Sequence, residues 1–393
     1  MLKETPVCSY FDKVIKKEKL VMAIESVPFI TLNRFEAGFK ESFMQGVQEL
    51  LDKTQFIGGP VVAELEESLS KKTKASYVVG CGNGTDAIQI ALRAVGVDFN
   101  DVVLLPDMTF WATFEAVVNN GAKPVTVDVN KNTCHWDLAT FKEAVDKYKP
   151  KAAILVHLYG HASPDTMEIR KYARDNNVLL VEDGAQCFDV EVDDQSVLGS
   201  ALIATTSFYP AKVLGASGDA GAVFTNDEKL AKRARVLANH GRTTHYTHGL
   251  VGWNSRIGSY ESLFLNHSLK HIDARLDSRR KAVQYYYENL QGLPLVPKVA
   301  ASNVKENGYC AVAMIDPSLR GDLIETLKSS GVGFGTIYPG AMSMQEGADK
   351  YLHDKIFNGN GDYISKAVLN LPCFAYITEE ELEYVVKTVK KHF

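Results

Sequence analysis

The chain of 393 residues has no apolar run that approaches the roughly 18 residues of a membrane span. Its first residues, MLKETPVCSYFDKVIKKEKLVMAI, carry charges that interrupt every apolar stretch. A signal peptide needs an unbroken apolar segment of 7–15 residues, so this start does not fit one. We therefore expect no membrane association and a cytoplasmic protein.

Three further features are missing, namely a strong charge, paired cysteines and a GxGxxG motif. The formal net charge is −5, so there is no electrostatic attraction to nucleic acid or to an anionic membrane. The six cysteines are scattered without a CxxC pair, which indicates reduced thiols rather than a disulfide framework. The sequence also shows no internal repeat and no low-complexity tract.

From about residue 56 to 226, short apolar runs alternate with amphipathic segments. The expected strands are residues 75–80, 101–106, 123–129, 152–160, 178–184, 203–210 and 221–226, and the expected helices between them are residues 85–95, 110–121, 138–148 and 165–177. This alternation predicts an α/β fold with a mostly parallel central sheet and helices on both faces. The last two strands are joined without a helix, so one of them is expected to run antiparallel.

After residue 226 the pattern changes. Residues 227–239 and 260–290 are expected to form helices, the second of them long, and the last helix should begin after Thr378 with a capping box to Glu381. The predicted domains are an N-terminal extension (1–27), a large domain (28–260) and a smaller C-terminal α+β domain (261–393).

Ligands of open parallel sheets collect at the carboxyl ends of the strands. There the chain places a glycine-rich turn, GCGNGT, which leads into a helix and suits an anion, although a purely structural turn is equally consistent. Asp183 closes a buried strand, with Gln186 one turn later; a simple helix-capping role for Asp183 is the alternative. Lys212 follows another strand among small residues, where desolvation would lower its pKa.

One cofactor uses a lysine, a carboxylate, a phosphate-binding turn and an aromatic ring together, and that is pyridoxal phosphate. Its aldehyde reacts with the lysine, its ring nitrogen pairs with the acid and its phosphate binds at a helix N-terminus. Phe110, after the second strand, is placed to contact the ring. The rival interpretation, a dinucleotide-dependent oxidoreductase using GCGNG, lacks the GxGxxG motif and gives Lys212 no role.

Eight ordered motifs resemble those of the DegT/DnrJ/EryC1/StrS sugar aminotransferases. The resemblance runs from VPFITL (27–32) almost to the C-terminus, through GNGTDAI, PDMTFWAT, HLYGH, VEDGAQ, SFYPAKVLGASGDAGAVFTND, NHGR, GWNSR and LNLPCF-x-x-ITEEE. It implies the fold of a type I pyridoxal-phosphate aminotransferase. It also implies that pyridoxal 5'-phosphate is the cofactor and alternates with pyridoxamine 5'-phosphate.

The resemblance assigns roles to individual residues. Lys212 would be the Schiff-base lysine, Asp183 would pair with the ring nitrogen, and Gln186 would bind the ring hydroxyl. Phosphate contacts would come from Gly84, Thr85 and Ser207, stacking from Phe110, and a phosphate contact across a homodimer interface from Asn254. Candidate substrate-binding residues are Arg256, Tyr338 and Ser343. No metal is expected, since His157 and His161 straddle a strand end rather than sharing a helix face.

The implied reaction moves an amino group from L-glutamate to a nucleotide-linked keto sugar, for surface polysaccharide or glycosylated natural products. A cyclitol ketone as acceptor and a noncatalytic relative that binds the cofactor remain alternatives. The sequence departs from the family after IYP, where Pro-Leu-His-x-Gln is usual and Ser343 replaces the histidine. The motif after GWNSR also differs. Residues before VPFITL have no counterpart, and their KVIKKEK run (13–19) is expected to be a solvated helix face.

Overall fold

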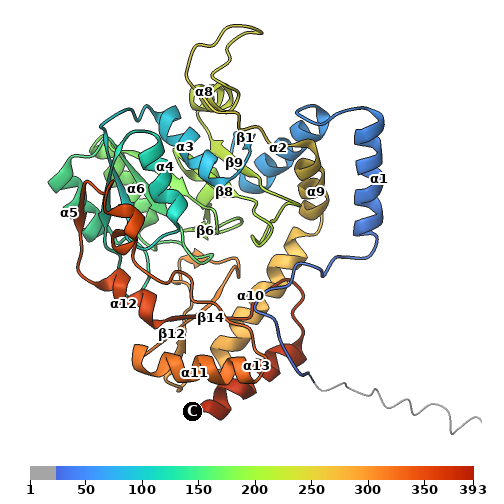
Figure 1. Cartoon of the computed structure of the whole chain (residues 1–393), viewed down its shortest axis with the longest axis vertical. Coiled ribbons are helices and arrows are strands. Elements are labelled where there is room, and N and C mark those ends of the chain that lie inside the picture. The colour runs from blue at the N-terminus through green and yellow to red at the C-terminus, as the bar shows by residue number, and fades with distance from the viewer. Residues whose placement is uncertain (1–23) are drawn as a thin grey trace, which may run out of the picture.

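A computed structural model describes residues 24–393 and contains an eight-stranded central sheet (Figure 1). The strand order is β1-β9-β8-β5-β4-β2-β3-β13. Their bounds are β1 Tyr77–Cys81, β2 Val102–Pro106, β3 Lys123–Val127, β4 Ala152–Val156, β5 Leu179–Asp183, β8 Ile203–Ser207, β9 Gly221–Thr225 and β13 Asp354–Ile356. Only β9 opposes its neighbours, because it pairs antiparallel with both β1 and β8. This confirms the mostly parallel sheet with one reversed strand.

Helices cover both faces of this sheet. They are α2 Pro60–Thr73, α3 Gly84–Val95, α4 Trp111–Asn119, α5 Leu138–Tyr148, α6 Thr166–Asp175, α7 Val197–Ser200 and α8 Glu228–Ala238. Helix α1 Phe39–Asp52 lies away from the sheet and packs against α9 Ser259–Leu269 (Figure 1). Alternate residues of β9 show the two faces: Val223 packs in a core with α3 and α8, whereas Ala222 and Phe224 pack in another core with α2 and α7. Successive side chains of a strand point to opposite faces, so β9 needs apolar residues at every position.

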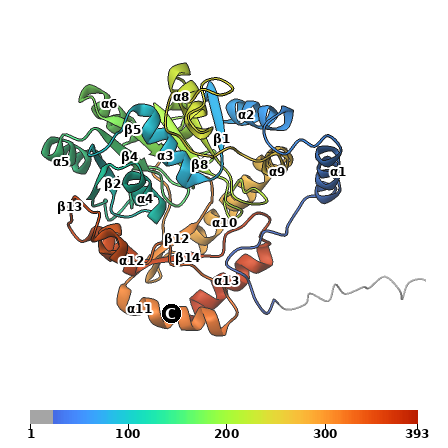
Figure 2. The same cartoon turned by 45° about the horizontal axis from the view of Figure 1, so that its top comes forward.

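The C-terminal part forms a second layer below the large sheet in Figures 1 and 2. Its elements are α10 Ile272–Asn289, β10 Leu295–Pro297, β12 Ala311–Ile315, α11 Pro317–Ser329, α12 Asn360–Ala367, β14 Val368–Leu371 and α13 Glu379–His392. Helix α9 precedes them and packs beside α2 at the level of the large sheet (Figure 1). Strands β10, β12 and β14 form an antiparallel sheet that shares an apolar core with α10, α11 and α13. The predicted capping box between Thr378 and Glu381 is present at the start of α13.

Smaller elements complete the fold. A three-stranded sheet joins β11 Val304–Lys305, β6 Glu191–Val192 and β7 Gln195–Ser196, and short 3₁₀ turns span Met342–Met344 and Glu346–Ala348. No helix within residues 24–393 has both the length and the apolar character that a membrane crossing requires.

Two sequence expectations need adjustment. The helix expected over residues 260–290 is wrong as one element, because α9 ends at Leu269 and α10 begins at Ile272. Strand β13 lies beyond the predicted boundary at residue 260 and yet pairs in parallel with β3 of the large sheet, so the domain division stays a prediction. The KVIKKEK run lies outside the described residues.

Candidate active site

A cavity of about 360 Å³ opens where the parallel strands end. The segments that follow β1, β2, β4, β5 and β8 all contribute to its wall, as expected for the carboxyl edge of a parallel sheet. It contains eight of the residues predicted from the sequence: Gly84, Thr85, Phe110, Asp183, Gln186, Ser207, Lys212 and Tyr338. The fold therefore brings together side chains that are separated by more than 250 positions in the chain.

Lys212 extends into this cavity from the loop after β8. Among the described residues, its Nζ has no hydrogen-bond or ion-pair partner and lies 5.0 Å from the ring centroid of Tyr309. Burial lowers the pKa of Lys212, and the negative charge of Asp183 opposes that shift only in part. A lysine with a lowered pKa supplies more of the neutral amine, which is the form that attacks a carbonyl group.

Asp183 is buried at the end of β5. Its Oδ2 accepts a hydrogen bond from the Thr113 hydroxyl at 3.0 Å, and its Oδ1 accepts one from the Ala185 N–H at 3.0 Å. Burial raises the pKa of Asp183, while these two hydrogen bonds and the charge of Lys212 act in the opposite direction. The carboxylate is thus oriented by neutral donors but is not neutralised by a bonded cation.

The first turn of α3 lines one part of the cavity. Asn83 caps the helix by accepting a hydrogen bond from the Asp86 N–H at 2.8 Å. The N–H groups of the first residues have no partner within the helix and lie at its positive end. A Cβ on Gly84 would lie 2.7 Å from the Cβ of Ser207, so glycine lets the helix start approach Ser207 closely.

Phe110, Gln186 and Tyr338 line the opposite part of the cavity. The Phe110 side chain is 57% exposed, and its ring centroid lies 5.8 Å from that of Tyr338. Gln186 Nε2 donates a hydrogen bond to the Tyr338 hydroxyl at 2.7 Å, which fixes the two side chains relative to each other. An exposed flat ring at the cavity mouth is available to stack on a planar ligand.

Three predicted residues lie elsewhere. Arg256 donates hydrogen bonds to Asn254 and, at 3.0 Å, to Asn239 Oδ1 at the end of α8, so Asn254 and Arg256 sit on the surface outside this cavity. The Ser343 hydroxyl donates to Oδ2 of the buried Asp107 at 2.9 Å. Ser343 is itself buried and does not line the cavity.

Two residues of the site were not identified from the sequence: Tyr309, which lines the cavity, and Thr113, which is buried next to Asp183. Thr113, which bonds to Asp183, lies one helical turn after Phe110, and that spacing places both near the start of α4. Tyr309 contacts Lys212 from just before β12, some 100 residues away in the chain, and no local pattern indicates this contact.

These residues fit pyridoxal phosphate on their chemistry. Within residues 24–393 the amine of Lys212 has no hydrogen-bond or ion-pair partner, and Asp183 has no bonded cation. The start of α3 offers N–H groups beside the Ser207 hydroxyl. Each part of the cofactor would thus find a group of matching charge or hydrogen-bonding capacity in the cavity.

Comparison with known proteins also indicates an aminotransferase. The sequence model of the DegT/DnrJ/EryC1/StrS aminotransferase family matches residues 38–390. A UDP-2-acetamido-2-deoxy-3-oxo-D-glucuronate aminotransferase of Pseudomonas aeruginosa is 32% identical over 91% of this chain and 98% of its own length. A pleiotropic regulatory protein of Geobacillus stearothermophilus is also 32% identical, over 94% of this chain and 99% of its own.

The fold is likewise similar to solved structures. NtdA of Bacillus subtilis, solved with the cofactor PMP bound, superposes with a TM-score of 0.86 at 27% identity. The superposition covers 94% of this chain and 85% of that one.

Proposed function

Because the chain belongs to the DegT/DnrJ/EryC1/StrS aminotransferase family, we propose that it transfers an amino group from L-glutamate to a keto sugar carried on a nucleotide. The observation that carries the proposal is the cavity in which the unpartnered amine of Lys212 shares one space with Asp183 and the start of α3. The printed name of the Pseudomonas relative, a UDP-linked 3-oxo sugar aminotransferase, supports the acceptor class.

The enzyme is a pyridoxal-phosphate-dependent aminotransferase. When bound, the cofactor supplies a ring that withdraws electrons from the carbon carrying the amine. Lys212 would first hold the cofactor and then move a proton to and from that carbon with its neutral amine. Asp183 would keep the ring nitrogen protonated, since a buried carboxylate favours a cation beside it.

The other cavity residues would position the reactants. The N–H groups at the start of α3, with Thr85 and Ser207, would hold the phosphate, while Phe110 would stack on the ring and exclude water from it. Gln186, oriented by its bond to Tyr338, would contact the ring hydroxyl. This arrangement would leave the amine of Lys212 facing the reacting carbon.

The residues outside the cavity fit a homodimer with shared active sites. Asn254 and Arg256 are exposed beside α8, where they would reach the phosphate and an anionic part of the substrate in the partner's cavity.

Tyr338 would contact the sugar at the cavity wall. Ser343 would contribute to substrate binding indirectly. Its hydrogen bond to Asp107 holds the loop that follows IYP, where the family motif has a histidine.

We place the enzyme in the cytoplasm, where nucleotide-linked sugars are available and thiols remain reduced. The five cysteines of the described residues are buried and free, which agrees with this location. The amino sugar produced would serve surface polysaccharides or glycosylated natural products.

Incubating the purified protein with L-glutamate and a panel of nucleotide-linked 3-keto and 4-keto sugars tests the proposal. We expect equal amounts of 2-oxoglutarate and one nucleotide-linked amino sugar, detected by mass spectrometry. A protein that aminated a cyclitol ketone and none of the nucleotide sugars would contradict the acceptor class. Formation of neither product would contradict the transferase assignment for these substrates.

A further inference from the structure

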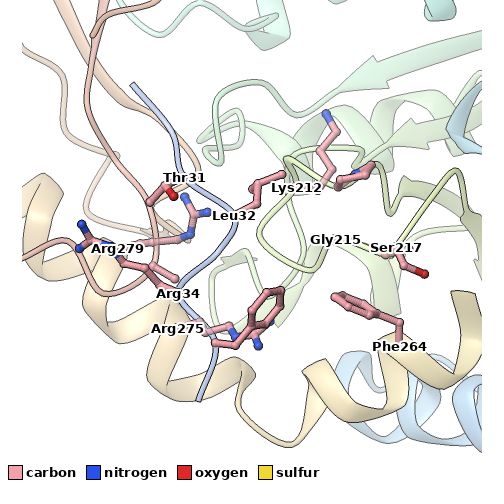
Figure 3. A pocket seen from close by; sticks show the side chains of 13 residues that line it. Thr31, Leu32, Arg34, Lys212, Gly215, Ser217, Phe264, Arg275 and Arg279 are labelled. Carbon is pink, nitrogen blue, oxygen red and sulfur yellow. The ribbon is translucent and has the colours of Figure 1, made fainter. Parts of the chain in front are cut away.

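The amine of Lys212 lies apart from the cations nearest to its loop. A second cavity, of about 280 Å³, is found on the other side of this loop and is lined by Arg34, Arg275 and Arg279 (Figure 3). Arg275 is paired with Glu36 through hydrogen bonds of 2.8 and 2.7 Å. In Figure 3 the Lys212 side chain extends upward, away from all three arginines. The position of the amine is therefore set on the cofactor side of the loop.

Few titratable groups surround this amine. Burial lowers the pKa of Lys212, and the charge of Asp183 and the thiols of Cys187 and Cys310 oppose that shift only in part. Burial raises the pKa of both thiols, so neither carries a charge at neutral pH. Within residues 24–393 the amine also has no hydrogen-bond or ion-pair partner. A positive charge on Lys212 thus needs another stabilising contact.

The ring of Tyr309 supplies such a contact. Nζ of Lys212 lies 5.0 Å from the ring centroid, and an aromatic face attracts a cation within roughly 6 Å. Burial raises the pKa of the Tyr309 hydroxyl, so the side chain is a neutral phenol and the attraction comes from its ring face. Tyr309 lines the cofactor cavity together with Lys212 and Asp183. The contact therefore lies inside the proposed site.

The backbone of Tyr309 is fastened to the segment that follows β5. Its N–H donates a hydrogen bond to Oδ1 of Asn307 at 2.9 Å. Nδ2 of Asn307 in turn donates to the carbonyls of Gln186 and Phe188, both at 2.9 Å. Asn307 is fully buried, so these hydrogen bonds are shielded from water. They hold Tyr309 at a fixed place beside the cavity although it comes from the C-terminal part of the chain.

We propose that the ring of Tyr309 holds the charged amine of Lys212 beside the reacting carbon whenever that amine is not bonded to the cofactor. The inference rests on the aminotransferase function, in which Lys212 takes a proton from that carbon and later returns it. As the C–H bond breaks, an N–H bond forms on Lys212, and the electron pair left on carbon passes to the cofactor ring. The amine becomes an ammonium in this step, and an aromatic face stabilises the ammonium rather than the neutral amine. Tyr309 is then a positioning residue for the proton carrier.

Acetylation of the cofactor-free protein across a range of pH tests the contact without turnover. Only a neutral amine reacts, so the labelling of the Lys212 peptide, measured by mass spectrometry, reports the pKa of Lys212. Tyr309→Phe keeps the ring and Tyr309→Leu removes it. We expect this pKa to fall by about 0.4–1.5 units in Tyr309→Leu, the worth of a cation–π contact, and to stay at the wild-type value in Tyr309→Phe. Lys281, exposed on α10, should give the same profile in all three proteins.

The enzyme loaded with pyridoxal phosphate gives a second measurement. In single turnovers with L-glutamate that carries deuterium on its α-carbon, proton transfer should be about two- to thirtyfold slower in Tyr309→Leu than in wild type. Tyr309→Phe should react at the wild-type rate. Thermal unfolding checks both variants. Tyr309→Phe with three fluorines on the ring keeps the shape but weakens the negative face, so it should lower the pKa of Lys212 even if Tyr309→Leu does not fold.

An equal pKa of Lys212 in Tyr309→Leu and Tyr309→Phe would overturn the proposal. So would an equal fall in both variants, because the hydroxyl of Tyr309 and not its ring would then act on the amine. The aminotransferase function fails separately, if the wild-type enzyme forms no 2-oxo acid from any amino donor. The acetylation profiles would still decide whether the ring holds the amine.

Discussion

Glu182 and Asp183 are neighbours on β5 and both are buried, but Glu182 pairs with a cationic side chain and Asp183 is bonded only to neutral donors. Glu182 faces α6, where Arg170 donates to it at 2.7 and 2.8 Å and His157 lies 2.9 Å away. Burial raises the pKa of Glu182, but Arg170 and His157 together outweigh this effect and the net shift is downward. Asp183 faces the cofactor cavity, and burial raises its pKa because its two neutral hydrogen bonds and the charge of Lys212 oppose the effect only in part.

The difference separates a structural charge from a functional one. Glu182 has its counterion in the fold, and the Arg170 guanidinium is further bonded to the Ser200 hydroxyl and the Val197 carbonyl. Asp183 is oriented equally well but lacks a bonded cation, which a protonated ring nitrogen would supply. Adjacent carboxylates on opposite faces of one strand therefore have different roles because different elements pack against each face.

Asp183→Asn should give the largest effect of the changes on β5. Removing one partner of a buried charge pair costs about 3–5 kcal/mol, so we expect amine transfer from glutamate to slow roughly 10²- to 10⁴-fold. Asn keeps an oxygen for Thr113 and Ala185, so folding should be preserved.

The same variant should not lose stability without the cofactor. The folded-state pKa of Asp183 is raised, so its ionisation costs stability as pH rises above the unfolded pKa. The cofactor-free Asp183→Asn protein should therefore be at least as stable as wild type at pH 7. Stopped-flow half-reactions and urea unfolding measure the two effects.

Glu182→Gln should show the reverse pattern. Loss of the carboxylate leaves the partly buried Arg170, whose side chain is 12% exposed, without a counterion. The free energy of unfolding should therefore fall by about 3 kcal/mol. The cavity face of β5 is unchanged, and Gln keeps an oxygen for His157, which lines the cavity. Turnover per folded molecule should therefore stay within a few-fold of wild type. Urea unfolding measures the stability, and turnover normalised to the titrated active sites measures the activity. A stable variant with poor turnover would mean that Glu182 is not a structural charge.

Thr113→Val sharpens the comparison on the cavity side. It removes the hydroxyl that bonds to Asp183 Oδ2 while keeping the side-chain shape. A hydrogen bond to a charged group is worth about 1.5–3 kcal/mol, so the donor half-reaction should slow roughly tenfold to a hundredfold. Thr113→Ser retains the hydroxyl and should recover most of the rate. Failure of Ser to recover it would mean that packing, not the hydrogen bond, matters at this position.

Glu36→Gln extends the comparison to a third carboxylate, with the smallest effect. The folded pKa of Glu36, about 2, lies below its unfolded value near 4.5, so its stabilisation is present above pH 4.5 and is lost as pH falls toward 2. Since Glu36 is only partly buried, we expect about 1 kcal/mol of destabilisation at pH 6. Urea unfolding should show this difference shrinking between pH 4.5 and 2; a constant difference would exclude ionisation as its cause.

Much of the site could be predicted because its residues follow strands. Apolar runs locate the strands, parallel strands place their ends together, and the polar residues after them, Asp183 and Lys212 among them, must then meet. The capping box of Thr378 and Glu381 was likewise visible in four consecutive residues.

Contacts made by packing could not be predicted in the same way. The break between α9 and α10 follows no proline or glycine, and β13 joins the large sheet from a segment 227 positions or more beyond β3. The cavity around Arg279 depends on Arg34 and Arg275, which approach from the N-terminal segment and from α10. Such long-range pairings leave no periodic signal in the sequence.

The most direct test of the account is the visible absorption spectrum of the protein with pyridoxal phosphate, recorded before and after adding L-glutamate, for wild type, Lys212→Ala and Lys212→Arg. We predict that the wild-type band shifts within seconds of mixing and that 2-oxoglutarate appears in equal amount. Both variants should bind the cofactor and leave its band unchanged by glutamate on that time scale. A Lys212→Ala protein that converted glutamate at the wild-type rate would contradict the role of Lys212 on which the whole site is built.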